Sequence, residues 1–596
     1  MVATAPAPKP VNAELLADVE PRFVKVREFL EPIASRCTVA PGFNSPEPNR
    51  IDVNIEAGDL LTAASAFYDN HWGYLAAITG LDHGPEEDYL EALYHFCGGA
   101  AVTTLRVKLP RHGGSVPSIA ERIPAAGFFE REFAEMFGVY PTGLQDCSHL
   151  FLPEDWPDGL YPLLKDTEIP SPKTIASMDG LDKPIVDQGG GRFIVPIGPQ
   201  HPALKEPGHF EFTVEGEIVV GASMRLGYVH RGLEKATESR NYIQNLYLLE
   251  RVCGICSHTH ASAYSNAVEQ LAGVEVPLRA QAIREIVAGL ERIHSHLLWL
   301  GVAAHEAGFD TLFMYSWRDR ETVMDLLEQI TGNRVNYSIC LLGGVKQDVN
   351  YAQADALRAG LDYLEQRSRH YYEVVTTDSM FLQRTRDIGT MSLAQAEYLG
   401  ALGPTARASG VVRDVRVEAP YGAYRRFPVS VVMDTAGDLE ARFKVRLKEL
   451  FVSCSAIRTI LDNLPDTELT TRMPRRVPAG ETVSRVEAPR GEAFYFVKSN
   501  GTDMPERVKV RTPSLCNWTS VLNQAIGRQL ADVPLLIAGM DPCFSCNDRM
   551  VVVRDNSMHH GVRSASSKGD AHHTEIWTWE KLRQYGIDFY RRGGNK

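Results

Sequence analysis

Hydrophobic positions repeat with a helical period over long stretches of the second half of the chain. Between residues 280 and 306, apolar side chains recur every three or four positions. They are Ile286, Leu290, Ile293, Leu297 and Leu300. This spacing places them on one face of a long helix, and Leu439 to Leu461 shows a similar pattern. Residues 193–549 are therefore predicted to form a mainly α-helical domain, packed as a bundle.

The N-terminal part combines two hydrophobic periods. Val24–Leu30 has a helical pattern, whereas Asn49–Ile55 alternates between polar and apolar residues like a half-buried strand. These patterns predict an α+β domain over residues 13–166, preceded by a loose tail at residues 1–12. Prolines and glycines gather at 167–192, which indicates a linker to the helical domain.

Composition narrows the possible functions. The 596 residues include 44% hydrophobic and 23% charged residues, which excludes a fibrous or mainly disordered chain. The net charge of −13 and the lack of a basic stripe disfavour nucleic-acid binding. No uncharged apolar run approaches the ~18 residues of a membrane helix, and the N-terminus lacks an apolar signal core. We expect a soluble, cytoplasmic chain that is able to dock on a membrane partner.

Four of the ten cysteines form two C-x-x-C pairs, Cys253 with Cys256 and Cys543 with Cys546. Each pair presents two thiolates from one turn, so both turns together can form a four-sulfur site. Such a site suits zinc, iron–sulfur clusters or nickel with iron. A structural zinc knuckle usually closes within ~20 residues, and a thioredoxin-like redox pair needs a βαβ context. A catalytic metal centre is favoured, with structural zinc and redox pairs as alternatives.

The motifs around these cysteines resemble a known family. Arg251–His260 (RVCGICSHTH) with Asp541–Cys546 (DPCFSC) resembles the large subunit of [NiFe] hydrogenases. Phe129–Gly138 resembles the 30-kDa subunit of respiratory complex I, and so does the later LPEDW segment. Gly198–Pro202 and His230–Lys235 resemble the 49-kDa subunit of that complex.

Together these motifs are the pattern of complex-I-like, group 4 [NiFe] hydrogenases of the formate hydrogenlyase type. The resemblance implies a 30-kDa-like α+β domain followed by a mainly helical hydrogenase domain, and the reaction H₂ ⇌ 2H⁺ + 2e⁻. The main alternative is a quinone-site subunit of complex I (NADH:quinone oxidoreductase) without nickel. In such subunits the first C-x-x-C is typically replaced and the second is absent, so the four cysteines favour the hydrogenase.

The resemblance also implies a role for each cysteine. Cys253 and Cys543 would be terminal thiolates on nickel. Cys256 and Cys546 would bridge nickel to an iron that carries CO and CN⁻ ligands. Cys543 would accept the proton from H₂, because a sulfur bound to one metal keeps more basicity.

Five further residues match positions near the metals in this family. Glu206 would take the proton onward from the sulfur. Arg490 would overhang the metal pair, and Asp541 would form an ion pair with it. Pro489, the residue before Arg490, would also lie beside the cofactor. His260 would donate a hydrogen bond to a bridging sulfur.

A further metal and a cleaved tail are also implied. Glu234 matches a ligand of a magnesium or iron ion, but the family's partner histidine is replaced here by Arg549. The alternative is an ion pair of Glu234 with Arg549 or Lys235.

Residues 550–596 would be an extension that a maturation endopeptidase removes, cutting before Met550. The alternative is that these residues include a C-terminal helix docked on the surface.

The expected partners follow from the same resemblance. The chain contains no further iron–sulfur motif, so a small subunit with a [4Fe–4S] cluster would carry the electrons away. Other hydrophilic Fe–S subunits and a membrane arm would complete the complex, with this chain peripheral on the cytoplasmic face of the cell membrane. The electron partner, the direction of turnover and ion pumping are not encoded in recognisable motifs.

Overall fold

The computed structural model describes residues 12–31, 39–41, 49–153, 156–168, 186–189, 191–201 and 204–547. All of them lie in one unit, Met1–Val552. The start of the expected tail, most of the expected linker, Arg549 and the expected C-terminal extension fall outside the described residues.

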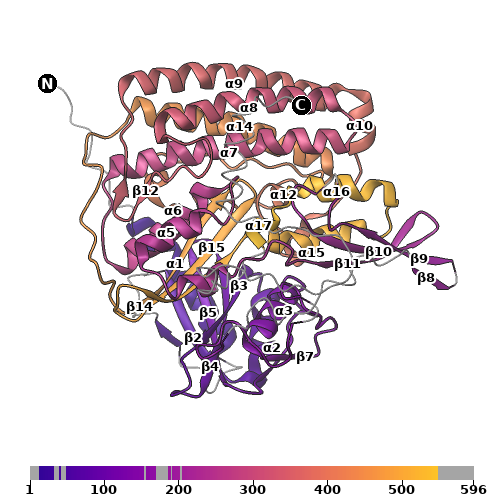
Figure 1. The fold of residues 1–596 in the computed structure, drawn as a ribbon, viewed down its shortest axis with the longest axis vertical. Helices are drawn as coiled ribbons and strands as arrows, with labels where there is room; N and C mark the ends of the chain where they lie inside the picture. Colours follow the sequence, from indigo (N-terminus) through magenta and orange to yellow (C-terminus); the bar gives the residue numbers. More distant parts are fainter. Residues whose placement is uncertain are drawn as a thin grey trace, which may run out of the picture. The chain divides into compact units, whose positions relative to one another are not determined.

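The N-terminal part is an α+β domain built on a five-stranded sheet of order β1-β2-β5-β4-β3 (Figure 1). Its strands are β1 (Val39–Pro41), β2 (Arg50–Ile55), β3 (Tyr74–Asp82), β4 (Tyr89–Gly98) and β5 (Ala101–Pro110). β2 and β5 run parallel, and the other neighbouring strands run antiparallel. The helices are α1 (Asn12–Leu30), α2 (Leu60–Asp69) and α3 (Ala126–Phe137), with short strands β6 (Ser115–Pro117) and β7 (Tyr140–Thr142). The predicted helix and strand correspond to the end of α1 and to β2.

A second, four-stranded antiparallel sheet precedes the helical domain and extends to one side of it (Figure 1). It contains β8 (Val186–Gly189), β9 (Arg192–Ile197), β10 (His209–Glu215) and β11 (Ile218–Arg225). Alternating residues of β10 are buried, as a sheet with one solvated face requires. The loop between β9 and β10 carries Glu206.

Four long helices form the body of the second domain: α7 (Leu278–Glu306), α8 (Asp310–Thr331), α9 (Tyr351–Thr377) and α14 (Leu439–Asp462) (Figure 1). The two helices that the hydrophobic period predicts are α7 and α14. They approach closely at Gly289, where an added Cβ would lie 2.8 Å from Ile457. The apolar stripe of α7 is buried throughout, which confirms the predicted mainly helical class.

Shorter elements surround the long helices and carry the cysteine turns. The helices α4 (Leu233–Thr237), α5 (Tyr242–Glu250) and α6 (Ser257–Leu271) precede α7. Between α9 and α14 lie α10 (Ser379–Thr385), α11 (Leu393–Tyr398), α12 (Gly403–Arg407) and α13 (Val415–Glu418). The last described elements are α15 (Pro513–Ala525), α16 (Val533–Met540) and α17 (Phe544–Asn547). A two-stranded pair, β12 (Cys340–Leu341) and β13 (Gly344–Val345), follows α8.

A three-stranded antiparallel sheet links the two domains. Its strands are β14 (Gly480–Ala488), β15 (Gly491–Ser499) and β16 (Pro505–Arg511). Tyr74 of β3 donates a 2.5 Å hydrogen bond to Glu492, and Arg511 donates one of 2.6 Å to the carbonyl of Ala76. Arg106 pairs with Glu481 at 2.8 Å. These buried and partly buried polar contacts hold the N-terminal sheet against the sheet of the helical domain.

Asp319 of α8 ties α8 to α9. Its buried carboxylate accepts hydrogen bonds from Tyr363 at 2.8 Å, from Arg367 at 2.7 Å and from Tyr371. Burial alone would raise the pKa of Asp319, but hydrogen bonds from Arg318, Tyr371 and Arg367 lower it to about 2. The ionised form is therefore the one that stabilises the fold.

Asp319→Asn is expected to lower the free energy of unfolding by roughly 2 kcal/mol at neutral pH. Because the folded pKa is depressed, this contribution is complete above the unfolded pKa of about 4 and is lost as the pH falls towards 2. Denaturant unfolding of both proteins between pH 3 and pH 7 measures it. Asp325→Asn, also on α8, is the control: it removes an exposed pair with Arg334, which follows the helix, and should cost under about 1 kcal/mol. An equal cost at pH 3 and pH 7 for Asp319→Asn contradicts the linkage.

Candidate metal centre

The two C-x-x-C turns lie at the starts of two helices. Cys253 and Cys256 occupy the turn between α5 and α6, and Cys256 is the N-cap residue of α6. Cys543 follows α16, and Cys546 lies in α17. Asp541, just before, ends α16 with a left-handed φ of 67°, which turns the chain sharply towards the cysteines.

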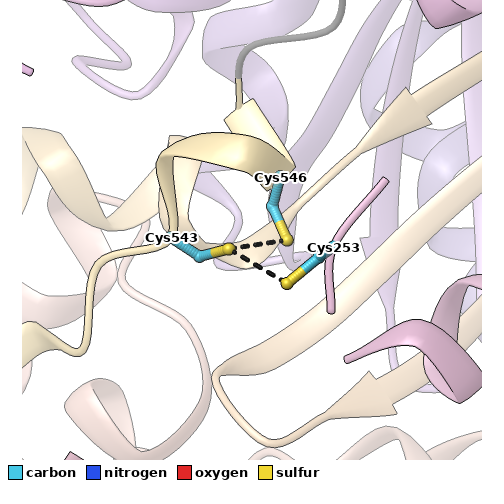
Figure 2. A group of neighbouring side chains, drawn as sticks. All are labelled: Cys253, Cys543 and Cys546. Carbon is cyan, nitrogen blue, oxygen red and sulfur yellow. Dashed lines mark hydrogen bonds between the residues drawn. The ribbon is translucent and has the colours of Figure 1, made fainter. Parts of the chain in front are cut away.

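The structure brings the four sulfur atoms together. Cys253 Sγ lies 3.3 Å from Cys543 Sγ, and Cys256 Sγ lies 3.3 Å from Cys546 Sγ. Cys543 Sγ and Cys546 Sγ are 3.0 Å apart, and Figure 2 shows these two sulfurs with that of Cys253. All four side chains are at most 3% exposed and are free thiols. These separations are far below the ~8 Å beyond which the two pairs could not share a metal core.

The donor set fits a soft metal. Two overlapping groups can hold an ion, one of Cys253, Cys543 and Cys546 and one of Cys256, His260 and Cys546. Within each group the ligand atoms lie within 4.8 Å of one another. Thiolates select zinc, iron or nickel over hard cations such as calcium and magnesium. A nickel–iron pair held by four sulfurs therefore fits these residues.

A buried positive charge lies beside the sulfurs. Arg490, in the tight turn between β14 and β15, donates to Asp541 from two nitrogens: Nε to the main-chain oxygen and Nη2 to Oδ1, both at 2.9 Å. The third guanidinium nitrogen, Nη1, lies 3.3 Å from Ser295 Oγ. Burial would lower the pKa of Arg490, but Asp541 and the charges of Cys543, Cys256 and Cys253 raise it well above its usual value. The guanidinium is thus a buried cation near the cysteine cluster.

Asp541 receives a second cation from Lys205. Lys205 Nζ lies 2.7 Å from Asp541 Oδ1, and the lysine is adjacent to Glu206 in the β9–β10 loop. Burial would raise the pKa of Asp541, but Arg490, Lys205 and Arg446 lower it below its usual value. Asp541 is therefore an ionised carboxylate that orients both cations.

Glu206 lies against the second cysteine turn. Its Oε2 accepts a 2.7 Å hydrogen bond from the main-chain N–H of Ser545 and is 4.0 Å from Cys543 Sγ. The Ser545 hydroxyl donates to the other carboxylate oxygen. Gly208 allows this approach, since an added Cβ would lie 2.1 Å from the ring of Phe544. The carboxylate is held within reach of a sulfur-bound proton.

His260 spans the space between a sulfur and a tyrosine. Its Nε2 is 3.5 Å from Cys546 Sγ, and its Nδ1 is 2.7 Å from the hydroxyl of Tyr495. With the proton on Nε2, the ring donates to the sulfur and accepts from the tyrosine. His258 instead contacts Ser262 and Cys340, and burial lowers its pKa to about 3.

The carboxylate of Glu234 lies close to cationic side chains. Its carboxylate accepts from Arg507 at 2.7 Å and from the main-chain N–H of Val510 at 3.1 Å, and Lys509 lies 3.8 Å away. Magnesium needs several oxygen ligands, and Glu234 belongs to neither ligand group found within the described part of the chain. Within the described part of the chain Glu234 forms an ion pair with Arg507. Arg549 lies outside that part, and the metal site at Glu234 stays a prediction.

Sequence reasoning did not single out three residues that complete the site. Lys205 neighbours Glu206, and Ser545 stands between the cysteines of the second pair, so proximity to a motif was the available signal. Tyr495 lies on β15, and no local pattern connects it with His260. Its role depends on the pairing of β14 with β15.

Family comparisons cover most of the chain. Residues 53–173 match the model of the 30-kDa subunit of respiratory-chain NADH dehydrogenase. Residues 231–302 match nickel-dependent hydrogenases, and residues 306–475 and 469–549 match the 49-kDa subunit of NADH dehydrogenase. Together with the four-thiolate site, these matches define the large subunit of a [NiFe] hydrogenase fused to a complex-I-like module.

Relatives define the family further. Formate hydrogenlyase subunit 5 of Escherichia coli is 34% identical over 91% of this chain and 94% of its own length. An NADH-quinone oxidoreductase subunit of Phocaeicola vulgatus is 32% identical over 78% of this chain and 92% of its own length. The chain belongs to the group 4, membrane-bound [NiFe] hydrogenase family and is an oxidoreductase that acts on H₂. This confirms the predicted family and activity.

One solved structure is also similar to this chain. A chain of the archaeal membrane-bound sulfane sulfur reductase, a respiratory membrane complex, aligns with a TM-score of 0.59 and 31% identity. The match covers 61% of this chain and all of that one. Among the described helices of this chain, none has the length and hydrophobicity needed to cross a bilayer.

Cys543→Ser is expected to remove nickel from the purified protein, because the position loses the thiolate that lies within 3.3 Å of two other sulfurs. Elemental analysis should fall from about one nickel per chain to under a tenth. Cys454→Ala, at a buried cysteine of α14 outside the sulfur cluster, should keep its nickel. Full nickel content in Cys543→Ser contradicts this ligand assignment.

Proposed function

We propose that this chain catalyses H₂ ⇌ 2H⁺ + 2e⁻ at a nickel–iron centre held by its two C-x-x-C turns. The meeting of the two turns carries this proposal, because it places four thiolates from distant parts of the chain in one buried cluster. Cys253 and Cys543 would hold nickel as terminal thiolates. Cys256 and Cys546, whose sulfurs are 3.3 Å apart, would hold both nickel and an iron that carries CO and CN⁻ ligands. When bound, the centre supplies heterolytic cleavage of H₂.

The chain's own groups then move the proton. Cys543 Sγ accepts it, and Glu206 Oε2, 4.0 Å away, takes it from the sulfur. Ser545 holds both carboxylate oxygens, so Glu206 is oriented before the proton arrives. His260 donates to Cys546 and withdraws electron density from that sulfur.

Arg490 provides fixed positive charge over the centre. It is fully buried and bound to Asp541, so it needs no reorganisation to stabilise negative charge on the sulfurs or on the cyanide ligands. Pro489 precedes it in the turn and restricts the backbone there. Lys205 adds a second cation through Asp541.

Electrons leave through a partner subunit. Among the described residues, the clustered cysteines are the four assigned to nickel and iron, which leaves none for an iron–sulfur wire. We assign that wire to a small subunit with a [4Fe–4S] cluster, followed by other hydrophilic Fe–S subunits. We place the whole on the cytoplasmic face of a membrane arm, in keeping with the respiratory membrane complex to which the similar solved chain belongs.

Removal of the C-terminal extension by an endopeptidase fits the burial of the second turn. Phe544, Cys543 and Cys546 are at most 2% exposed, so metal insertion requires an open form of this segment. Cutting after Arg549 would follow insertion and let the turn close. Arg549 and residues 550–596 lie outside the described residues, and an intact mass that includes them in the nickel-loaded protein contradicts this step.

The quinone-site function without nickel is the alternative. Metal analysis combined with infrared spectroscopy of the anaerobic complex separates the two. A hydrogenase gives about one nickel per chain together with CO and CN⁻ stretching bands. Stoichiometric zinc, or the lack of both nickel and these bands in active preparations, rejects the proposal.

Glu206→Gln is expected to retain nickel and the infrared bands but to slow H₂/D⁺ exchange by about 10² or more, because an amide does not accept the proton. Glu217→Gln, an exposed carboxylate at the turn of the same sheet, is the matched control and should exchange normally. Full exchange in Glu206→Gln means that the proton leaves the sulfur by another group.

A further inference from the structure

Tyr495 lies on the central strand of the three-stranded sheet, and its hydroxyl group contacts the ring of His260. Strand β15 pairs with β14, where Tyr495 is opposite Ser484, and with β16, where it is opposite Val510. The Tyr495 hydroxyl oxygen is 2.7 Å from His260 Nδ1. The other ring nitrogen, Nε2, is 3.5 Å from Cys546 Sγ. One imidazole ring thus connects the central strand with the cysteine cluster.

Both faces of β15 are packed against apolar side chains, which holds this strand in place. Successive side chains of a strand point to opposite faces of the sheet. Phe494 and Phe496 belong to the apolar core that includes the N-terminal sheet, and their rings lie 5.0 Å and 5.6 Å from the ring of His95 on β4. Tyr495, between them, belongs to the core of the helical domain. A strand held between two close-packed cores gives the tyrosine hydroxyl little freedom to leave His260.

Tyr495 contacts His260 through its hydroxyl group rather than by stacking. The centroids of the two rings are 6.0 Å apart, and their planes are inclined by 60°. Both side chains are at most 1% exposed, so the hydrogen bond between them is protected from water. Removing the hydroxyl therefore removes the contact with Nδ1 and leaves the aromatic ring of Tyr495 packed as before.

The two neighbours of His260 make different demands on its ring. A metal-bound thiolate offers only lone pairs, so the nitrogen that faces Cys546 must carry a hydrogen for this contact to be attractive. In the neutral ring the other nitrogen, Nδ1, is then an acceptor. A tyrosine hydroxyl both donates and accepts, so it is able to donate to Nδ1. In the opposite tautomer the Nε2 lone pair would face the sulfur, and that contact would be repulsive.

We propose that Tyr495 is a positioning residue for the metal centre, whose hydroxyl holds the ring hydrogen of His260 on Nε2 and so keeps His260 a donor to Cys546. The inference rests on the proposed function, in which nickel and iron share Cys546. A hydrogen bond to a ligand sulfur withdraws electron density from it, so less of that density reaches the metals. Tyr495 acts on the centre through His260.

Four variants separate this role from packing. Tyr495→Phe removes the hydroxyl and keeps the buried ring. His260→Leu removes the donor to Cys546 itself, and the double variant tests whether Tyr495 acts through His260. Tyr94→Phe is the matched control. Tyr94 is also a fully buried tyrosine on a strand, and its hydroxyl has no hydrogen-bond partner among the described residues.

The first readout is the position of the CO and CN⁻ infrared bands in the complete, nickel-loaded complex. We expect both bands to shift to lower frequency in Tyr495→Phe and in His260→Leu, because an iron with more electron density donates more of it to these ligands. The double variant should show the shift of His260→Leu and no more. Tyr94→Phe should keep the wild-type bands. Unchanged bands in Tyr495→Phe, or additive shifts in the double variant, overturn the proposal.

The second readout is the tautomer of His260, which reports on the protein rather than on the metals. Isotope labelling of the histidine rings gives it as an infrared difference, in which the spectrum of the matching His260→Leu protein is subtracted. We expect the hydrogen on Nε2 in the wild type and a mixture of both tautomers in Tyr495→Phe. A wild-type ring with hydrogen on Nδ1 or on both nitrogens contradicts the proposal, and so does an unchanged tautomer in Tyr495→Phe.

The two readouts also distinguish failure of this inference from failure of the proposed function. If the wild-type complex lacks the CO and CN⁻ bands, the proposed function has failed, and the tautomer alone decides the role of Tyr495. A hydrogen that lies on Nε2 in the wild type and is divided between both nitrogens in Tyr495→Phe then supports the positioning role. The same tautomer in both proteins rejects it.

Discussion

The structure depends on bringing four thiol groups, from turns far apart in sequence, into one buried cluster with sulfur–sulfur contacts of 3.0–3.3 Å. Thiolates so placed repel each other, and burial makes their charge costly. The surrounding chain opposes both effects. Glu291 anchors the first turn through main-chain N–H groups, and Arg490 holds the start of the second through hydrogen bonds to Asp541. A metal pair would neutralise the remaining charge, so folding of the two turns and metal binding are coupled.

Buried charges recur throughout the catalytic domain, and they are paired in networks. Arg407 binds both Glu449 and Glu487, and Arg292 donates to the main-chain oxygen of Glu487 and to Glu449. These contacts hold the end of β14, three residues before Arg490. Ion pairs deep in the helical layer thus help to fix the position of Arg490 beside the cysteine cluster. Rigid placement of this kind is what preorganised electrostatic stabilisation requires.

The N-terminal domain packs against the sheet that carries these residues. Its β3 strand contacts the β14–β16 sheet through Tyr74 and Arg511, and Lys509 of β16 pairs with Glu132 of α3. Lys509 also lies near Glu234, so the carboxylate that the family pattern suggests as a metal ligand is drawn into the domain interface. The fused module thus supports the sheet that carries Tyr495, the hydrogen-bond partner of His260.

The sequence by itself determined the elements with strong periodicity, such as α7 and α14, and singled out the two cysteine turns, because both are local patterns of residue type. It also pointed to Glu206 and Arg490 through motifs a few residues long. Only the tertiary structure decided that Ser545 orients Glu206, that Lys205 shares Asp541 with Arg490, and that Glu234 binds Arg507. These contacts join residues up to several hundred positions apart, and long-range pairing of polar groups leaves no period or spacing in a single sequence.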